Sequence, residues 1–128
     1  MKVMVVEEGE GALFFVCQAL EALGVEIIRS PSPDEDKVLM YKIEAVIHIW
    51  SGFTAEIEMT RLRGLKEADP DLVLVIFAQP QDVPTLRRSF PNDLIAAVSA
   101  MEGPQAARAA QAMVQEVRKR KPPVSTQG

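Results

Sequence analysis

The sequence contains few of the residues from which disulfides and metal centres are built. It has one cysteine and one histidine among 128 residues. The lone cysteine, Cys17, allows no disulfide within the chain, which favours a reducing compartment. Cys17 falls in an apolar helical stretch, so we expect a core residue rather than a reactive thiol. The lone histidine, His48, allows no His–His metal pair.

Long apolar runs and excess positive charge are also lacking. No apolar run approaches the ~20 residues that a membrane span needs, and no signal peptide precedes the first expected strand. The net charge of −4 and the pI near 5.0 disfavour a nucleic-acid surface. The one basic run, Arg118–Lys121, ends the last expected helix, where cations complement the helix dipole. We therefore expect a cytoplasmic protein without a membrane or nucleic-acid partner.

What the sequence does contain is a regular alternation of strand and helix patterns. Short apolar, β-branched segments predict five strands. These strands are Val3–Val6, Val25–Arg29, Ala45–Trp50, Leu72–Ala78 and, more weakly, Leu94–Val98. The run Leu72–Phe77 has no polar break, as in a central parallel strand that is covered on both faces. Val25–Arg29 is more polar and suits an edge.

Helical patterns fill the intervals between these strands. Gly11–Leu23 and Thr54–Ala68 are predicted helices, the second with Ile57, Leu62 and Leu65 on its buried stripe. Ser32, Pro33 and Glu35 have the spacing of a capping box that opens a helix running to Tyr41. Pro84–Phe90 is predicted to be a short helix or a turn. A long helix opens at Gly103, with Ala106, Ala109, Ala110, Met113 and Val117 on its inner face. Alternating strands and helices predict a doubly wound α/β fold with a parallel sheet and helices on both faces. We expect one domain over residues 1–121 and a disordered tail or linker over 122–128.

The layout and the opening segment resemble the receiver domain of bacterial response regulators, which act in two-component phosphorelay signalling. The resemblance covers residues 1–121. Receivers begin with an apolar strand that ends in two acidic residues, and these hold a magnesium ion; Glu7 and Glu8 match them. Asp69-Pro70-Asp71, just before the fourth strand, also fits. The resemblance implies a flavodoxin-like, five-stranded sheet with strand order 2-1-3-4-5.

Three further groups of the receiver site are missing. In receivers a phosphoacceptor aspartate ends the third strand, a serine or threonine ends the fourth, and a lysine ends the fifth. Ile49 takes the aspartate position, or His48 if the register is one residue different. Phe77 takes the hydroxyl position, and Ala97, or Val98, takes the lysine position. The resemblance therefore implies a degenerate, non-enzymatic pseudo-receiver.

The acidic pair has two interpretations. Glu7 and Glu8 alone would make a weak magnesium site, because magnesium requires near-octahedral oxygen coordination. Otherwise they are solvated residues of a β–α loop. We expect no cofactor, with magnesium as the single candidate.

The region around the missing phosphoacceptor also has two interpretations. His48 lies in an apolar strand, which favours a hydrogen-bonded neutral core histidine over phosphohistidine or a general base acting with Ser51. Trp50 and Phe77 are expected to cluster with Gly52 and Phe53 at the carboxyl ends of the strands. There they either fill the space of the lost site or form an apolar patch for a ligand or partner.

These residues lead to one main hypothesis and two alternatives. The main one is a receiver-like module that binds a protein partner or a second copy without aspartate phosphorylation. In receivers the face formed by the fourth helix, fifth strand and fifth helix mediates such contacts; here it carries Arg87, Arg88, Asp93, Arg108, Gln111 and Gln115. The first alternative is a flavodoxin-like domain that binds a small apolar or aromatic ligand at Trp50 and Phe77. The second is an active receiver with His48 or Ser51 as substitute phosphoacceptor.

Overall fold

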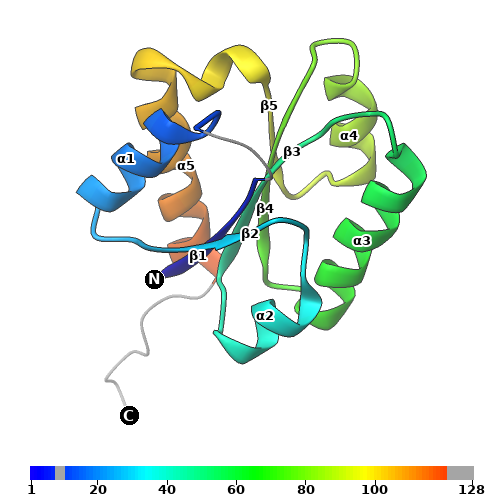
Figure 1. Ribbon diagram of the computed structural model, residues 1–128, viewed down its shortest axis with the longest axis horizontal. Coiled ribbons are helices and arrows are strands. Elements are labelled where there is room, and N and C mark those ends of the chain that lie inside the picture. Colours follow the sequence, from blue (N-terminus) through cyan, green and yellow to red (C-terminus); the bar gives the residue numbers. More distant parts are fainter. Residues whose placement is uncertain (8–10, 121–128) are drawn as a thin grey trace.

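A parallel sheet of five strands lies between two layers of helices (Figure 1). The computed structural model describes residues 1–7 and 11–120. The strand order is β2-β1-β3-β4-β5, and every neighbouring pair is parallel. The strands are β1 (Lys2–Val6), β2 (Glu26–Ser30), β3 (Ala45–Ile49), β4 (Val73–Ala78) and β5 (Leu94–Ala97). The predicted fold class and strand order are confirmed.

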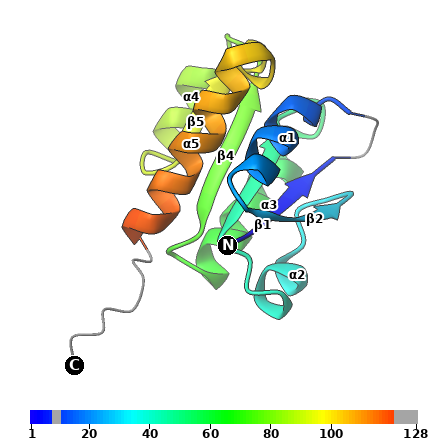
Figure 2. The ribbon, with the colours of Figure 1, turned by 90° about the vertical axis from the view of Figure 1, so that its left-hand side faces the viewer.

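The helices follow the strands in strict alternation and cover both faces of the sheet. They are α1 (Phe14–Ala22), α2 (Glu35–Met40), α3 (Ala55–Ala68), α4 (Val83–Ser89) and α5 (Gly103–Arg120), with the 3-10 helix η1 (Val98–Met101) before α5. Helices α1 and α5 pack on one face (Figure 2), and α2, α3 and α4 pack on the other. In the part of the chain that is described, no helix is both long and apolar enough to cross a bilayer.

The position of β4 between the two helical layers explains why its run of apolar residues has no polar break. Val73, Val75 and Phe77 pack into the α1–α5 layer, whereas Leu74 and Ile76 pack into the opposite layer. Successive side chains of a strand point to opposite faces, so a central strand covered on both faces needs an apolar residue at each position. All six residues of β4 are buried.

The polar segment predicted as an edge strand is β2, which pairs only with β1. Its Glu26 and Arg29 side chains are exposed. Cys17 is buried in the α1–α5 layer, as expected, and burial raises the pKa of its thiol. A low fraction of thiolate at neutral pH makes this sulfur a poor nucleophile.

Helix α2 begins two residues later than the capping box predicted. Its N-cap is Asp34, whose carboxylate accepts a hydrogen bond from the backbone N–H of Lys37 at 3.1 Å. Ser32 does not cap the helix; its carbonyl oxygen accepts a hydrogen bond from the Ser30 hydroxyl. Serine and aspartate are both good N-caps, and here the aspartate has the extended backbone that a cap requires.

The buried stripe of α3 also differs from the prediction by one residue. Leu62 and Leu65 are buried, but Ile57 is 54% exposed and Glu58 is buried in its place. Residues 58, 62 and 65 are separated by four and three positions, so they share one side of an α-helix. The prediction followed hydrophobicity and therefore chose the isoleucine; the carboxylate of Glu58 is buried because it has specific partners, described below.

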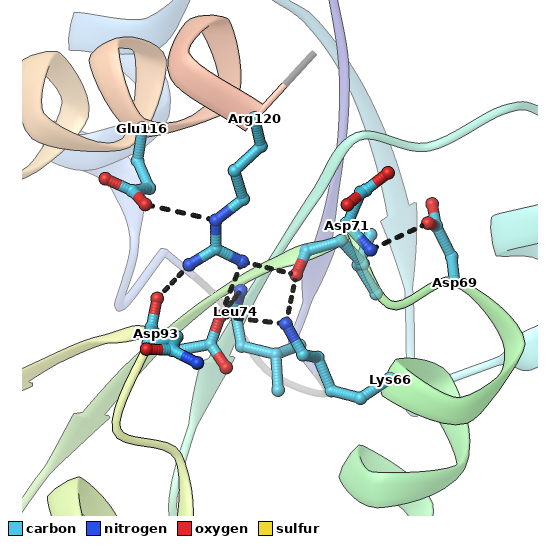
Figure 3. Close-up of polar contacts among 9 residues, drawn as sticks. Lys66, Asp69, Asp71, Leu74, Asp93, Glu116 and Arg120 are labelled. Atoms are coloured by element: carbon cyan, nitrogen blue, oxygen red, sulfur yellow. Dashed lines mark hydrogen bonds and ion pairs between the residues drawn. The ribbon is translucent and has the colours of Figure 1, made fainter.

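The amino edge of the sheet is closed by a charged network centred on Asp93, whose side chain is 2% exposed (Figure 3). One carboxylate oxygen contacts the ammonium of Lys66 at 3.3 Å and the guanidinium of Arg120 at 3.2 Å. The same oxygen accepts a hydrogen bond from the backbone N–H of Leu74 at 3.0 Å. The network therefore joins the last turns of α3 and α5 to the start of β4 and to the loop before β5.

Arg120 makes most of the contacts that hold α5 in this network. Its guanidinium donates to the carbonyl oxygens of Leu72 and Asn92 and to the carboxylate of Glu116 one turn earlier. The sequence analysis gave the basic end of this helix only the role of complementing the helix dipole. Arg120 has a further role, because its side chain is 14% exposed and contacts both the start of β4 and the loop before β5.

Candidate functional site

The candidate site lies at the carboxyl edge of the sheet, where open α/β sheets bind ligands. The strand register shows where the residues that the sequence analysis aligned with the receiver site lie. Ile49 ends β3 directly beside Phe77 of β4, and Ala97 ends β5 beside Ala78. Ile49 and Phe77 both contribute to the α1–α5 layer, and Phe77 is fully buried. The two positions that the sequence analysis aligned with a receiver's carboxylate and hydroxyl therefore carry an aliphatic and an aromatic side chain, next to each other in the sheet.

The expected cluster of Trp50 with Phe77 does not form. Trp50 is buried among the side chains of the α2–α3–α4 layer, whereas Phe77 is buried in the α1–α5 layer. The two residues are neighbours through the backbone only, because the N–H of Trp50 donates to the carbonyl of Phe77 at 2.8 Å. The alternation of β3 continues into Trp50, the residue after the strand, so Ile49 and Trp50 point to opposite faces. No shared apolar patch exists for a ligand, and both rings are core residues.

The residues described here do not fit a receiver's magnesium ion. Glu7 accepts a hydrogen bond from the N–H of Leu13 at 3.2 Å and pairs with the guanidinium of Arg29 at 3.3 Å, so both of its oxygens have partners. Glu8 lies outside the described residues. Within residues 1–7 and 11–120, no three His, Cys, Asp or Glu side chains are grouped to hold a metal. Among the described residues, Glu7 alone does not supply the several oxygen ligands that magnesium requires, and Ile49 adds none.

A polar cluster that the sequence analysis did not identify lies beside these positions. The buried carboxylate of Glu58, on the first turns of α3, reaches back to the loop after β3. One of its oxygens accepts from the N–H and the hydroxyl of Ser51, at 3.0 and 2.9 Å. The other accepts from the N–H of Gly52 at 3.2 Å. Gly52 has a φ of 81°, a left-handed conformation that favours glycine. The Glu58 side chain therefore holds the β3–α3 loop in place through these three hydrogen bonds.

His48 is the fourth partner of this carboxylate. Its Nε2 lies 3.3 Å from Oε1 of Glu58, and the residue is 6% exposed. Burial lowers the pKa of His48 below its ordinary value, although the nearby Glu58 opposes this shift. A neutral imidazole with the proton on Nε2 donates to Glu58 and leaves Nδ1 as a bare acceptor. The prediction of a hydrogen-bonded neutral core histidine agrees with this arrangement.

Glu58 remains ionised in this environment. Burial raises its pKa, but the hydrogen bonds from Ser51 and Gly52 and the proximity of His48 outweigh burial and leave the pKa below its ordinary value. Ser51 and His48 both donate to the same oxygen of Glu58. Because the hydroxyl does not donate to the imidazole, the cluster lacks the nucleophile–base contact of a catalytic relay.

These shifts predict that the stability of the fold decreases as the pH falls below about 6.5, the pKa of an unfolded histidine. Above that value His48 is neutral in both states; below it, the unfolded chain binds the proton first, which favours unfolding. The slope from this one proton is at most about 1.4 kcal/mol per pH unit. Glu58 adds a further loss at lower pH, because its folded pKa is depressed and the unfolded carboxylate is protonated first.

Urea unfolding between pH 7.5 and 4 measures this dependence. In the His48→Gln variant an amide still donates to Glu58 but does not titrate. We expect the free energy of unfolding of this variant to change little with pH near 6. It should still fall at lower pH, where Glu58 is protonated in the unfolded chain. An unchanged slope near pH 6 in His48→Gln would show that His48 does not titrate as described.

The residues predicted for an interaction face lie in two different environments. Arg87 and Arg88 on α4 and Arg108, Gln111 and Gln115 on α5 are exposed. The carboxylate of Asp93 adds no charge to this surface, because it is buried in the charged network at the amino edge, although the residue also lines the groove on this face. The prediction placed Asp93 there from its position before β5; the ion pairs with Lys66 and Arg120, distant in sequence, turn it inward.

Comparisons with known proteins identify the fold. No protein-family model and no curated protein matches the chain. A response regulator from Thermotoga maritima is 20% identical, with a TM-score of 0.66 over 91% of this chain and 96% of that one. A response regulator receiver domain protein from Clostridium thermocellum is 17% identical, with a TM-score of 0.65 over 94% and 96%. The pseudo-receiver domain of the CikA protein is 17% identical, with a TM-score of 0.63 over 95% and 98%.

The chain therefore has the fold of response-regulator receiver domains, pseudo-receivers included, as the resemblance implied. At these identities the likeness shows the fold and leaves function to be argued from the residues of this chain.

Proposed function

We propose that this chain is a non-enzymatic, receiver-like signalling module that binds another protein chain without being phosphorylated at its sheet edge. The observation that carries the proposal is the pairing of Ile49 with Phe77 at the carboxyl ends of β3 and β4. Phosphoryl transfer depends on a carboxylate nucleophile with a metal ion and hydrogen-bond donors around it. Neither paired side chain supplies such a group, and Ala97 supplies no cation.

The face formed by α4, β5 and α5 is the surface that we assign to the partner. A groove of about 510 Å³ runs along it, lined by small and apolar residues that include Leu94, Ala96, Ala109 and Ala112. Arg87 lies at this groove, and β5 is an edge strand that pairs only with β4. An apolar centre with charged residues around it is the usual anatomy of a protein interface. A second copy of the chain is the simplest partner to test.

Incubation with acetyl phosphate and magnesium, followed by intact-mass measurement, tests the first half of the proposal. We expect no gain of a phosphoryl group, because neither Ile49 nor Phe77 is a nucleophile and His48 is buried against Glu58. A stable gain that maps to His48 or Ser51 would instead support a receiver with a substitute acceptor.

Sedimentation velocity on the same samples tests the second half. We expect concentration-dependent association that is equal with and without acetyl phosphate. Arg108→Glu on α5 should weaken it, whereas Arg63→Glu on α3, across the sheet, should not. A protein that stays monomeric at all concentrations would overturn self-association.

A further inference from the structure

Strand β2 forms one edge of the sheet and carries backbone groups that point away from it. At its two ends, Glu26 donates its N–H to the residue before β1, and Ser30 accepts from the residue after β1. Residues 26, 28 and 30 therefore face β1, and alternation along the strand turns the N–H and C=O groups of Ile27 and Arg29 outward. Among the described residues these backbone groups have no partner. Such an edge is a template for pairing with another strand.

Exposed apolar side chains gather on the helices that flank β2. Figure 2 shows β2 between α1, which covers one face of the sheet, and α2, which covers the other. Among the described residues, six of the eight exposed large hydrophobic side chains belong to these two helices or to the residue that ends each: Phe14, Phe15, Leu23, Leu39, Met40 and Tyr41. Helices α4 and α5 carry none of the eight. Apolar exposure of this extent beside a sheet edge indicates a surface that another chain covers.

The outward groups of β2 are complementary to those of a second copy. In an antiparallel pair, two residues that lie directly opposite can exchange both of their hydrogen bonds. When Ile28 of one copy lies opposite Ile28 of the other, Ile27 of each copy lies opposite Arg29 of the other. Every outward N–H and C=O of these two residues then has a partner, which gives four hydrogen bonds between the copies. The two Ile28 side chains form a β-branched pair across the strands, which stabilises a sheet.

Registers shifted by one residue leave groups unpaired. A pair centred on Ile27 places Val25 opposite Arg29, but the N–H of Val25 already donates to the carbonyl of Leu20 at 3.0 Å. A pair centred on Arg29 places Pro31 opposite Ile27, and proline has no N–H to donate. It also brings the two arginines directly opposite each other, which like charges disfavour. The register about Ile28 is therefore the one that satisfies the edge.

The charges fit the same register. Arg29 lies on the α1 side of the sheet, as Ile27 does, and antiparallel pairing brings it toward the end of the second copy's α1. Glu21 is exposed in that last turn, and the C-terminal end of a helix attracts cations. Glu26 lies opposite Ser30, so no like charges meet directly across the pair. The charges therefore favour a second copy of this chain as the occupant of the edge.

We propose that a second copy of this chain pairs with β2 in the antiparallel sense about Ile28, so that the two sheets join into one. The two-fold axis is perpendicular to the sheet and keeps each layer on its own face. Helix α1 therefore packs beside the second copy's α1, and α2 beside α2, which covers the exposed apolar side chains. The inference goes beyond the proposed function, because the face formed by α4, β5 and α5 lies at the opposite edge of the sheet.

Amide hydrogen exchange, measured by NMR at two protein concentrations, tests the pairing in the unmodified chain. In a single copy the N–H groups of Ile27 and Arg29 lack an acceptor, whereas in the pair both are bonded. We expect their exchange at about 1 mM protein to be at least about tenfold slower than in an unbonded amide. Dilution should reverse this protection, and Ile28, which faces β1, should stay protected throughout. Fast exchange of Ile27 and Arg29 at the higher concentration would contradict the proposal.

Variants made in the Arg108→Glu background separate this contact from the α4–β5–α5 face. Sedimentation velocity should show a dimer for Arg108→Glu and a monomer once Ile27→Pro is added, because proline removes one outward N–H and is tolerated on an edge strand. Ile27→Ala is the matched control, since it shortens the same side chain but keeps the N–H, and it should remain dimeric. Urea midpoints check that each variant is folded, and the exchange experiment decides should Ile27→Pro not fold.

The outcomes distinguish this contact from the proposed function. A monomeric Arg108→Glu variant, or a folded Ile27→Pro variant that still dimerises in that background, overturns pairing through β2. If wild type associates no further than the Arg108→Glu dimer, the pairing through β2 stands and self-association through the α4–β5–α5 face fails.

Discussion

Replacing Asp93 with alanine is expected to lower the free energy of unfolding by about 3 kcal/mol, the cost of removing one partner from a buried ion pair. The change would leave Lys66 and Arg120 facing each other without the carboxylate, and the N–H of Leu74 without an acceptor. Both cations retain some exposure, which places the effect at the lower end of the range for buried pairs. Urea unfolding at pH 7 measures the change.

Asp71→Ala is the matched control, because Asp71 is an exposed aspartate that lines the same end of the molecule. We expect its effect to be below about 0.5 kcal/mol, as for most surface substitutions. Lys66→Met and Arg120→Met should each cost less than Asp93→Ala, since Asp93 would keep one cation and the N–H of Leu74. If Asp93→Ala lowers the free energy of unfolding no more than Asp71→Ala does, the charged network does not stabilise the fold.

The second large effect is expected at Glu58. Its replacement by alanine removes the acceptor of both loop N–H groups and of His48. Unsatisfied donors of this kind typically cost about 1 to 3 kcal/mol, and the partial exposure of the loop reduces the penalty, so we expect a loss of about 2 kcal/mol. Amide hydrogen exchange at Ser51 and Gly52 should rise with it, because both N–H groups lose their protection.

Glu56→Ala provides the comparison for this site. Glu56 lies on the same turn of α3 but is exposed, and among the described residues its side chain makes no hydrogen bond to the loop. It should cost no more than about 0.5 kcal/mol, the contribution of an acidic residue near a helix N-terminus. Glu58→Gln should be intermediate, because an amide retains one acceptor but presents its NH₂ group to a donor. Equal exchange rates in wild type and Glu58→Ala would show that the loop is held by other contacts.

The sequence predicted the elements that depend on local pattern and on burial by apolar residues. β4 and the inner face of α5 followed from hydrophobic periodicity, since residues such as Phe77, Ala106 and Met113 are buried where the pattern places them. The alignment of Ile49 and Phe77 with receiver groups rests on position along the strands and stays a prediction; the structure shows that the two residues are partners at the carboxyl ends of β3 and β4.

Neither the local sequence pattern nor the burial of apolar residues predicted the polar clusters around Asp93 and Glu58. Asp93 contacts Lys66 and Arg120, which are each 27 residues away in the sequence, so the pairing exists only in the folded chain. Glu58 was missed because a hydrophobicity-based pattern prefers Ile57 one position earlier. One local signal was present: an acidic residue early in a helix that follows a Ser-Gly loop can reach back to the loop N–H groups.

The contacts of Glu58 with the loop after β3 have a consequence for control. In a receiver, an added phosphoryl group supplies the anion that biases the state of the domain, so other enzymes can switch the signal on and off. In this chain the carboxylate of Glu58 already accepts from the loop N–H groups in the folded protein, so the loop is held without an added group. Under the proposed function, such a module acts through the binding of its partner, so its output depends on the concentrations of the two chains.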